Sequence, residues 1–286
     1  MQVVFHGVRG STPCHGDEVA RYGGNTSCVS LRIPGEDPLF FDLGTGARYL
    51  ARELAHDGSF RGTCLLSHLH WDHTQGLPFF TPLLREGSHL DIHAPAQEDG
   101  RSVGDIFSEV IRPPLFPITL DQMPGSLGFH DTGDCTFAVG SATVTARLVP
   151  HIGPTLGYRV EWGGRSVVYL SDHQQPHDGS HALTDGARDL VSGADVLIHD
   201  SQFTPHEFAS KSNWGHCTID YAVWVALECG VGTLVLFHHD PGRADNELDA
   251  IASRVAAEAG ERGLRVIAAY EGMTLELPPL GAGARP

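Results

Sequence analysis

Several features that would mark common classes of protein are absent from this sequence. Its six cysteines include no Cys-x-x-Cys pair, and their scattered positions indicate reduced, buried thiols in a cytoplasmic protein. The first residues carry neither a charged leader nor a long apolar run, which argues against a signal peptide and a membrane span. No long polar or Pro/Gly/Ser linker divides the chain, so we expect one domain over residues 1–286, with a flexible tail at 278–286.

Positive charge is also scarce. The chain has 19 Lys+Arg against 35 Asp+Glu, which gives a formal net charge of -16, and it contains no basic cluster. Binding of long nucleic acid depends on neutralising several phosphates, so we expect the protein to take no long nucleic acid. Bound metal ions would cancel part of the negative charge locally, which leaves room for a small anionic substrate.

The chain does contain one dense group of potential metal ligands, Ser67-His68-Leu69-His70-Trp71-Asp72-His73, directly after an apolar run. A strand that ends in a turn can direct His68 and His70 to one point. The turn that follows can bring Asp72 and His73 to a neighbouring point. Imidazole and carboxylate ligands together suit zinc, and also iron or manganese. Because histidines seldom fall at this spacing after a strand by chance, a metal site is favoured over a His-rich surface loop.

The remaining pattern alternates runs of strands with helices. Strands are predicted at 2–7, 28–33, 38–43, 61–66, 89–94, 136–149 (a hairpin), 156–162, 165–170, 195–198, 234–237 and 265–269. Helices are predicted at 47–56, 104–111, 219–229 and 245–259. This order fits an α/β protein with two mixed sheets packed face to face and helices outside.

Potential ligands recur at the ends of later strands. His151, Asp172 and His238 each follow a predicted strand, although a single histidine in such a place is more often structural. In Leu236-Phe237-His238-His239-Asp240 either histidine could be the ligand, and His238 is our choice with His239 as the alternative. Asp42 precedes a Gly-rich turn, where it could cap the turn or hold a ligand histidine by a hydrogen bond.

The motif His-x-His-x-Asp-His at 68–73 resembles the signature of the metallo-β-lactamase superfamily. The resemblance extends over most of the chain and implies a four-layer αββα sandwich that holds two divalent metal ions, with zinc as the first choice and manganese or iron as alternatives. It implies the following ligand set: His68, His70 and His151 for one metal, Asp72, His73 and His238 for the other, and Asp172 as a bridge. The lactam-hydrolysing members usually lack the bridging carboxylate, so Asp172 argues against a lactamase.

Two segments in the second half resemble ribonuclease Z and its relatives, including the cyclic-phosphate diesterases. Leu197-Ile198-His199-Asp200-Ser201-Gln202-Phe203 is similar to their His-Glu-Ala-Thr segment, with Asp200 in place of Glu. Gly215-His216-Cys217-Thr218 is similar to their Gly-His-Ser-Thr. The resemblance implies that His216 protonates the leaving alkoxide, and that Asp200 orients His216 and raises its pKa. The structural alternative makes Asp200 a turn former and His216 a residue at a helix N-terminus.

The sequence therefore predicts a dinuclear metal-dependent hydrolase with Asp72, His216 and Asp200 as catalytic residues. The expected reaction is hydrolysis of a small phosphodiester, such as a cyclic nucleotide or a cyclic phosphate, by a hydroxide that bridges the metals. Hydrolysis of a thioester or lactone, or an iron-loaded redox protein or oxygenase, is the alternative. We find no Gly/Lys-rich arm of the kind that grips transfer RNA, which argues against precursor tRNA. The relatives often pair, so a homodimer is left open.

Overall fold

Two β-sheets form the centre of the computed structural model, which describes residues 1–280. The strands of the first sheet are β1 (Gln2–Gly7), β2 (Cys28–Arg32), β3 (Leu39–Phe41), β4 (Arg61–Leu65), β5 (His89–Pro95), β6 (Ser126–Thr132) and β14 (Thr274–Glu276). The strands of the second sheet are β7 (Cys135–Val139), β8 (Ala142–Leu148), β9 (Leu156–Trp162), β10 (Arg165–Leu170), β11 (Val196–Asp200), β12 (Thr233–Phe237) and β13 (Arg265–Ala268).

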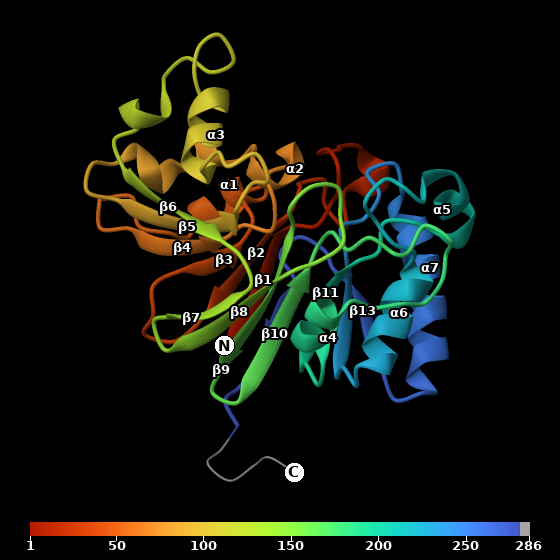
Figure 1. Ribbon diagram of the computed structural model, residues 1–286. Coiled ribbons are helices and arrows are strands. Elements are labelled where there is room, and N and C mark those ends of the chain that lie inside the picture. The colour runs from red at the N-terminus through yellow and green to blue at the C-terminus, as the bar shows by residue number, and fades with distance from the viewer. Residues whose placement is uncertain (281–286) are drawn as a thin grey trace.

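Helices cover the outer faces of both sheets (Figure 1). They are α1 (Ala47–Ala51), α2 (Trp71–Thr74), α3 (Val103–Val110), α4 (Asp185–Val191), α5 (Pro205–Lys211), α6 (Ile219–Glu228) and α7 (Asp245–Gly260). Short 3₁₀ turns lie at Asp17–Val19, Leu77–Phe79, Thr81–Leu84 and Leu120–Gln122. The predicted four-layer αββα sandwich is confirmed.

The strand order places the predicted ligands at one edge of the molecule. The orders are β14-β1-β2-β3-β4-β5-β6 and β13-β12-β11-β10-β9-β8-β7. Strands β3 to β6 run parallel to one another, and so do β10 to β13. Because the carboxyl ends of parallel strands meet at the same edge, the residues that follow β3, β4, β10, β11 and β12 are brought together.

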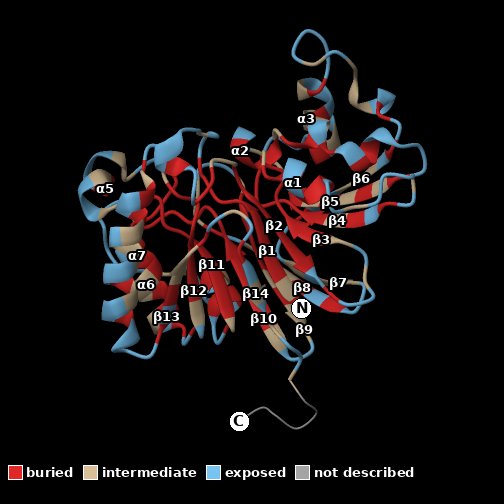
Figure 2. Cartoon of the chain, turned by 180° about the vertical axis from the view of Figure 1, so that it is seen from behind, coloured by how far each residue is buried: buried red, intermediate tan, exposed pale blue. Residues whose placement is uncertain are grey.

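The core between the sheets is apolar and is shared by both. Phe41 of β3 stacks on Tyr169 of β10 with 4.6 Å between ring centroids, and Phe5 of β1 lies 6.1 Å from Phe237 of β12. Such aromatic pairs add about 1 kcal/mol each beyond the area they bury. Figure 2 shows the buried strands in red, with exposed faces on the outer helices. The two halves of the chain therefore share one core, as a single domain requires, although the boundaries 1–286 stay a prediction.

The structure departs from the sequence prediction mainly in short, weakly patterned elements. Strands β6 and β14 and helices α4 and α5 were missed, because they lack a long apolar period. The helix predicted at 47–56 ends at Ala51, whose carbonyl lies 2.8 Å from Nε2 of His56. Within the predicted tail, Leu280 donates its N–H to Gly163, and residues 281–286 lie outside the described part. Among residues 1–280, no helix is long and apolar enough to cross a bilayer.

A buried histidine in β1 leads to a prediction about acid stability. The Nε2 atom of His6 lies 2.8 Å from Oγ of Ser30, and burial lowers the pKa of His6 from 6.5 to about 4. Below pH 6.5 the unfolded chain binds the proton first, so stability is lost as the pH falls from 6.5 towards 4. We expect His6→Gln to be less sensitive to acid than the wild type by about 2 kcal/mol between pH 7.5 and pH 5.

Urea unfolding at the two pH values measures this difference, provided that the m-values agree. The exposed His15 supplies the control, because His15→Gln should keep the pH sensitivity of the wild type. Equal pH sensitivity in His6→Gln and the wild type would show that His6 does not contribute.

Candidate metal centre

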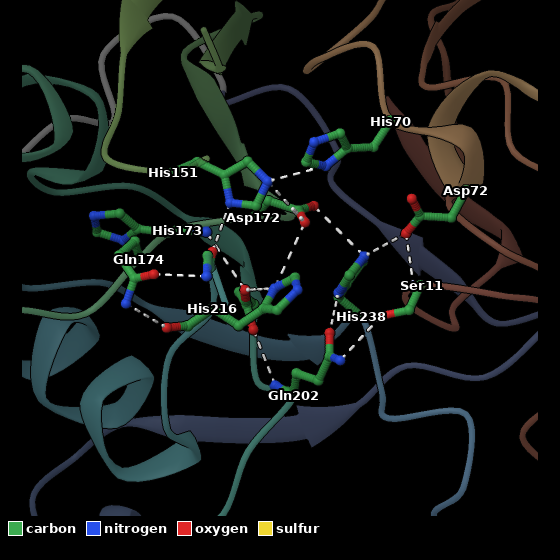
Figure 3. Close-up of polar contacts among 12 residues, drawn as sticks. Ser11, His70, Asp72, His151, Asp172, His173, Gln174, Gln202, His216 and His238 are labelled. Atoms are coloured by element: carbon green, nitrogen blue, oxygen red, sulfur yellow. Dashed lines mark hydrogen bonds and ion pairs between the residues drawn. The ribbon is translucent and has the colours of Figure 1, made fainter. Parts of the chain in front are cut away.

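All the predicted ligands lie in one cluster at the shared edge of the sheets. Figure 3 shows five of them, His70, Asp72, His151, Asp172 and His238. Their ligand atoms form overlapping groups in which all atoms lie within 4.8 Å of one another. The groups are His68/His70/His151, His68/His73/Asp172, Asp72/His73/His238 and Asp172/Asp200/His216/His238. Residues from six separate stretches of the chain are therefore brought to one place, as the parallel strand ends predict.

One half of the cluster consists of His68, His70 and His151. The Nδ1 atom of His70 lies 2.8 Å from Nε2 of His68 and 3.3 Å from Nε2 of His151. His151 donates its Nδ1–H to the carbonyl of Gly215 at 2.6 Å, which leaves its Nε2 as a bare acceptor. Ser67 donates its hydroxyl to Asp42, so it can accept from Nδ1 of His68, whose Nε2 is then bare as well.

The other half consists of Asp72, His73 and His238. His73 donates its Nδ1–H to Asp42 at 2.6 Å, and His238 donates its Nδ1–H to Oε1 of Gln202 at 2.9 Å. Their Nε2 atoms lie 3.3 Å apart, and Oδ2 of Asp72 is 3.2 Å from the first and 3.1 Å from the second. With both Nδ1 atoms used by hydrogen bonds, the Nε2 lone pairs face the cluster.

Asp172 lies between the two halves. Its Oδ1 is 4.0 Å from Nε2 of His68 and 3.8 Å from Nε2 of His151. Its Oδ2 is 3.1 Å from Nε2 of His73 and 3.5 Å from Nε2 of His238. This oxygen is buried and has no hydrogen-bond partner. Bare ring nitrogens around an unpaired carboxylate oxygen repel one another unless cations lie among them, so the donor set fits two metal ions.

Burial sets the proton affinity of the histidines. It lowers the pKa of His151 to about 4, and it also lowers the pKa of His68 and of His70, so that these rings are neutral and able to bind metal near pH 7. Burial acts to lower the pKa of His73 too, but Asp72, Asp172 and Asp42 outweigh it and raise that pKa. A proton and a metal ion therefore compete for His73.

Asp42 is not among the potential metal ligands but supports them through hydrogen bonds. Its carboxylate accepts hydrogen bonds from the Ser67 N–H at 2.7 Å, the Tyr169 hydroxyl at 2.7 Å and Nδ1 of His73. The residue is completely buried. Of the two roles that the sequence left open for Asp42, the structure therefore shows the hydrogen bond to a candidate ligand histidine.

The backbone around His238 explains which of the two adjacent histidines faces the cluster. His238 has a φ of 57°, in the left-handed region, which turns its ring toward Asp72. His239 instead lies 3.0 Å from the carbonyl of Ala269, outside the cluster. Gly10 packs against His238 so closely that a Cβ there would lie 2.3 Å from the ring, which requires glycine.

Three contacts of the cluster were not predicted from sequence. Gln202 orients His238, Tyr169 donates to Asp42, and the backbone N–H of Ser11 donates to Oδ2 of Asp72 at 2.7 Å. Ser11 is exposed and has a φ of 61°, which turns its N–H toward this carboxylate. The neighbouring Arg9 is completely buried and donates to backbone carbonyls, including that of Gly23.

His216 and Asp200 form a pair at the side of the cluster. Nδ1 of His216 donates to Oδ2 of Asp200 at 2.8 Å, and lies 3.6 Å from Oδ1 of Asp172. Burial acts to lower the pKa of His216, but the carboxylate of Asp200 outweighs it, with a further contribution from Asp172, and the pKa is raised. Because Nδ1 is used by Asp200, Nε2 is the atom from which His216 can give a proton to a bound molecule.

The loop that carries His216 is held by two glutamines that follow Asp172. Gln174 accepts from the N–H of Gly215 at 2.6 Å, and its Nε2 lies 3.2 Å from the carbonyl of His216. Gln175 accepts from Thr218, the first residue before α6. These glutamines were not predicted from the sequence. Their position soon after the strand predicted at 165–170 is the feature of the sequence that could have pointed to them.

Two facing mixed sheets with a His/Asp cluster at one edge form an αββα sandwich with a candidate metal centre. Together with the family and the relatives described next, they define a metal-dependent hydrolase. The chain belongs to the β-lactamase superfamily, whose domain model matches residues 50–239, more than half of its length. The resemblance seen in the sequence is thereby confirmed.

Named relatives cover nearly the whole chain. Ribonuclease Z from Synechococcus sp. (strain WH7803) is 27% identical over 90% of this chain and 91% of its own. The metallo-beta-lactamase fold protein YhfI from Bacillus subtilis superposes with a TM-score of 0.72 at 19% identity, over 96% of this chain and 98% of its own. The short form of human tRNase Z gives a TM-score of 0.65 at 24% identity, over 97% and 100%.

These relatives correct one prediction. The expectation that the protein takes no long nucleic acid is wrong, because proteins that match nearly the whole chain are named as ribonuclease Z and tRNase Z. The net charge of -16 is a sum over the whole surface. Phosphate binding depends on the charge near the site, where divalent ions held by the His/Asp cluster would supply positive charge. Net charge therefore does not decide the length of the substrate.

Proposed function

We propose that the protein is a phosphodiesterase that holds two divalent metal ions, zinc as the first choice, through the seven predicted ligands. The observation that carries this proposal is the position of Asp172, with one oxygen toward each half of the cluster and Oδ1 3.6 Å from His216. A bridging carboxylate beside a protonated histidine suits displacement at phosphorus, where the leaving oxygen needs a proton. The ribonuclease Z relatives, named for the cleavage of a phosphodiester polymer, support the same reaction class.

The residues divide the work as follows. When bound, two metal ions supply an activated water and neutralise charge on the phosphate. Asp42 and Gln202 fix the rings of His73 and His238 with Nε2 toward the site. His216 holds a proton at Nε2 for the leaving oxygen, and Asp200 stabilises the imidazolium form.

A small, cyclic phosphodiester is the substrate that we propose first. A pocket of about 380 Å³ beside His151 supports it, since that volume suits one organic group next to the phosphate. An RNA is the second candidate, and the names of the relatives favour it. Both are phosphodiesters. The cytoplasmic location and a homodimer stay predictions.

Turnover by metal-stripped protein reloaded with zinc, manganese or iron tests the proposal. The substrates are bis(p-nitrophenyl) phosphate, a nucleoside 2′,3′-cyclic phosphate, an RNA with a 3′ extension, and a thioester. We expect metal-dependent hydrolysis of the phosphodiesters, with the cyclic phosphate and the RNA compared by kcat/KM. Hydrolysis of the thioester alone would assign the site to thioesters, and oxygen consumption by the iron form without hydrolysis would assign it to redox chemistry.

A further inference from the structure

An exposed serine lies beside the candidate metal centre. Ser11 follows β1, and its backbone N–H donates to Oδ2 of Asp72 at 2.7 Å. Its Oγ lies 3.1 Å from Nε2 of Gln202. Figure 3 shows Ser11 at the right of the cluster, beside Asp72 and Gln202. Because Ser11 is exposed, a molecule bound at the cluster can reach its hydroxyl.

The backbone at Ser11 is held in an unusual conformation. Within residues 1–280, three residues other than glycine have a positive φ, and they are Ser11, Asp42 and His238. His238 is a candidate ligand, and Asp42 hydrogen bonds to another one. A side chain in this region of φ is strained, so the contacts around it must hold it there. The hydrogen bonds of Ser11 to Asp72 and Gln202 therefore place its hydroxyl at a fixed position beside the cluster.

The role of His238 as a ligand fixes the direction of the Gln202 amide. If Nε2 of His238 binds a metal ion, its Nδ1 carries the proton and donates to Oε1 of Gln202 at 2.9 Å. The NH₂ end of the amide then faces Ser11 and donates to its Oγ. Gln202 is the one hydrogen-bond partner of this hydroxyl within residues 1–280. The proton of the Ser11 hydroxyl is therefore free to be donated to a bound molecule.

The arginines near this loop are not available to a substrate. Arg9 is completely buried and donates to three backbone carbonyls. Arg243 is buried too, and it donates to the carbonyl of Gln202 and to the carboxylate of Glu207. A phosphate oxygen on this side of the cluster must therefore take its hydrogen bond from an uncharged group. The hydroxyl of Ser11 is such a group.

We propose that Ser11 binds the substrate: its O–H donates a hydrogen bond to a non-bridging oxygen of the phosphodiester, and Gln202 positions the hydroxyl for this contact. The inference rests on the proposed function, under which the substrate is a phosphodiester. The non-bridging oxygens carry the negative charge, which strengthens this hydrogen bond. Ser11 and His216 then act on different oxygens of one phosphate, since His216 serves the leaving oxygen.

Binding of dimethylphosphinate to zinc-loaded protein tests the contact without turnover. This anion has the two non-bridging oxygens of a diester, and its P–C bonds are not hydrolysed. We expect Ser11→Ala and Ser11→Gly to raise its Kd, measured by ³¹P NMR, about tenfold. Both variants keep the backbone N–H that Asp72 accepts, so both should keep the metal content of the wild type. Glycine also suits the positive φ, so a loss in both variants belongs to the hydroxyl.

Ser59 supplies the matched control. It is exposed and lies before β4, whereas the candidate ligands lie after that strand. Its hydroxyl donates to Asp57. Ser59→Ala should therefore bind dimethylphosphinate as the wild type does.

Turnover and a double-mutant cycle test how Ser11 acts. Ser11→Ala should lower kcat/KM for bis(p-nitrophenyl) phosphate about tenfold, mainly through KM, because the hydrogen bond exists in both the bound substrate and the transition state. Gln202→Glu offers an acceptor to Ser11 and so captures its proton. In that background, Ser11→Ala should leave the Kd for dimethylphosphinate unchanged.

The outcomes separate this inference from the proposed function. An unchanged Kd in both Ser11 variants would overturn the role of Ser11, and so would a loss of metal from both. If Ser11→Ala fails to fold, Ser11→Gly decides the question. A further tenfold loss in the Gln202→Glu background would reject the positioning by Gln202. Dimethylphosphinate binding that depends on Ser11, in protein that hydrolyses no phosphodiester, would keep the contact and reject the phosphodiesterase.

Discussion

Replacement of Asp172 by alanine is expected to lower phosphodiester turnover by about a thousandfold or more and to reduce the bound metal. Asp172 is the residue whose two oxygens face both halves of the cluster, at 3.1 Å from His73 and 3.8 Å from His151. Without its negative charge, two divalent ions held by the two halves of the cluster would repel each other with less compensation. Metal content by mass spectrometry and turnover of bis(p-nitrophenyl) phosphate, measured on the same samples, check both effects.

Two further variants make the result specific. Asp172→Asn keeps the shape and removes the charge, so it should resemble the alanine variant if charge holds the metals together. The exposed Asp178 lies on the same loop and hydrogen bonds to Ser180, so Asp178→Ala should keep full metal content and turnover. If Asp172→Ala protein binds its full complement of metal and stays active, the carboxylate is not needed for the reaction, and our proposal loses its basis.

Ligands of the cluster that lie close together in the sequence were easier to predict than those that lie far apart. His68, His70, Asp72 and His73 lie within one turn and were recognisable as a group. His151, Asp172 and His238 needed both the strand-end rule and the family resemblance, since a single residue at a strand end carries little information. The structure places all of them together because parallel strands direct their carboxyl ends to one edge.

The contacts that sequence missed join residues far apart in the chain. Tyr169 reaches Asp42 across the interface between the sheets, and Gln202 reaches His238 from the neighbouring strand end. Gln202 also reaches Ser11, which lies 191 residues earlier in the chain. No periodicity or motif encodes such pairings, because each depends on strands that only the complete fold brings together.

The exclusion of long nucleic acid was wrong for a related reason. Net charge follows from composition alone, so it does not show where on the surface the charged residues lie. At the site, the histidines and the metals they can hold decide how phosphate is received, while most acidic residues are elsewhere on the surface. Relatives named for RNA cleavage therefore coexist with an acidic chain.

Replacement of His216 by alanine should leave the metals in place and slow hydrolysis according to the leaving group. A diester with an alkoxide leaving group should lose about 10²–10⁴-fold in kcat, since a general acid contributes about this much. A p-nitrophenyl diester should lose far less, because p-nitrophenolate leaves without a proton. Asp200→Asn should give a smaller loss in the same pattern, because it removes only the partner that holds Nδ1 of His216.

Metal analysis distinguishes this role from two others. His216 lies in a group with Asp172 and His238 that could itself hold a metal ion, so loss of metal in His216→Ala would make it a ligand. An equal loss on both leaving groups with full metal content would make it a binding residue. His206→Ala, at an exposed histidine on α5, should change neither measurement. A loss that depends on the leaving group, in protein that keeps its metals, identifies His216 as the proton donor. Only a proton donor acts on the departing oxygen itself, so only its removal affects the two leaving groups differently.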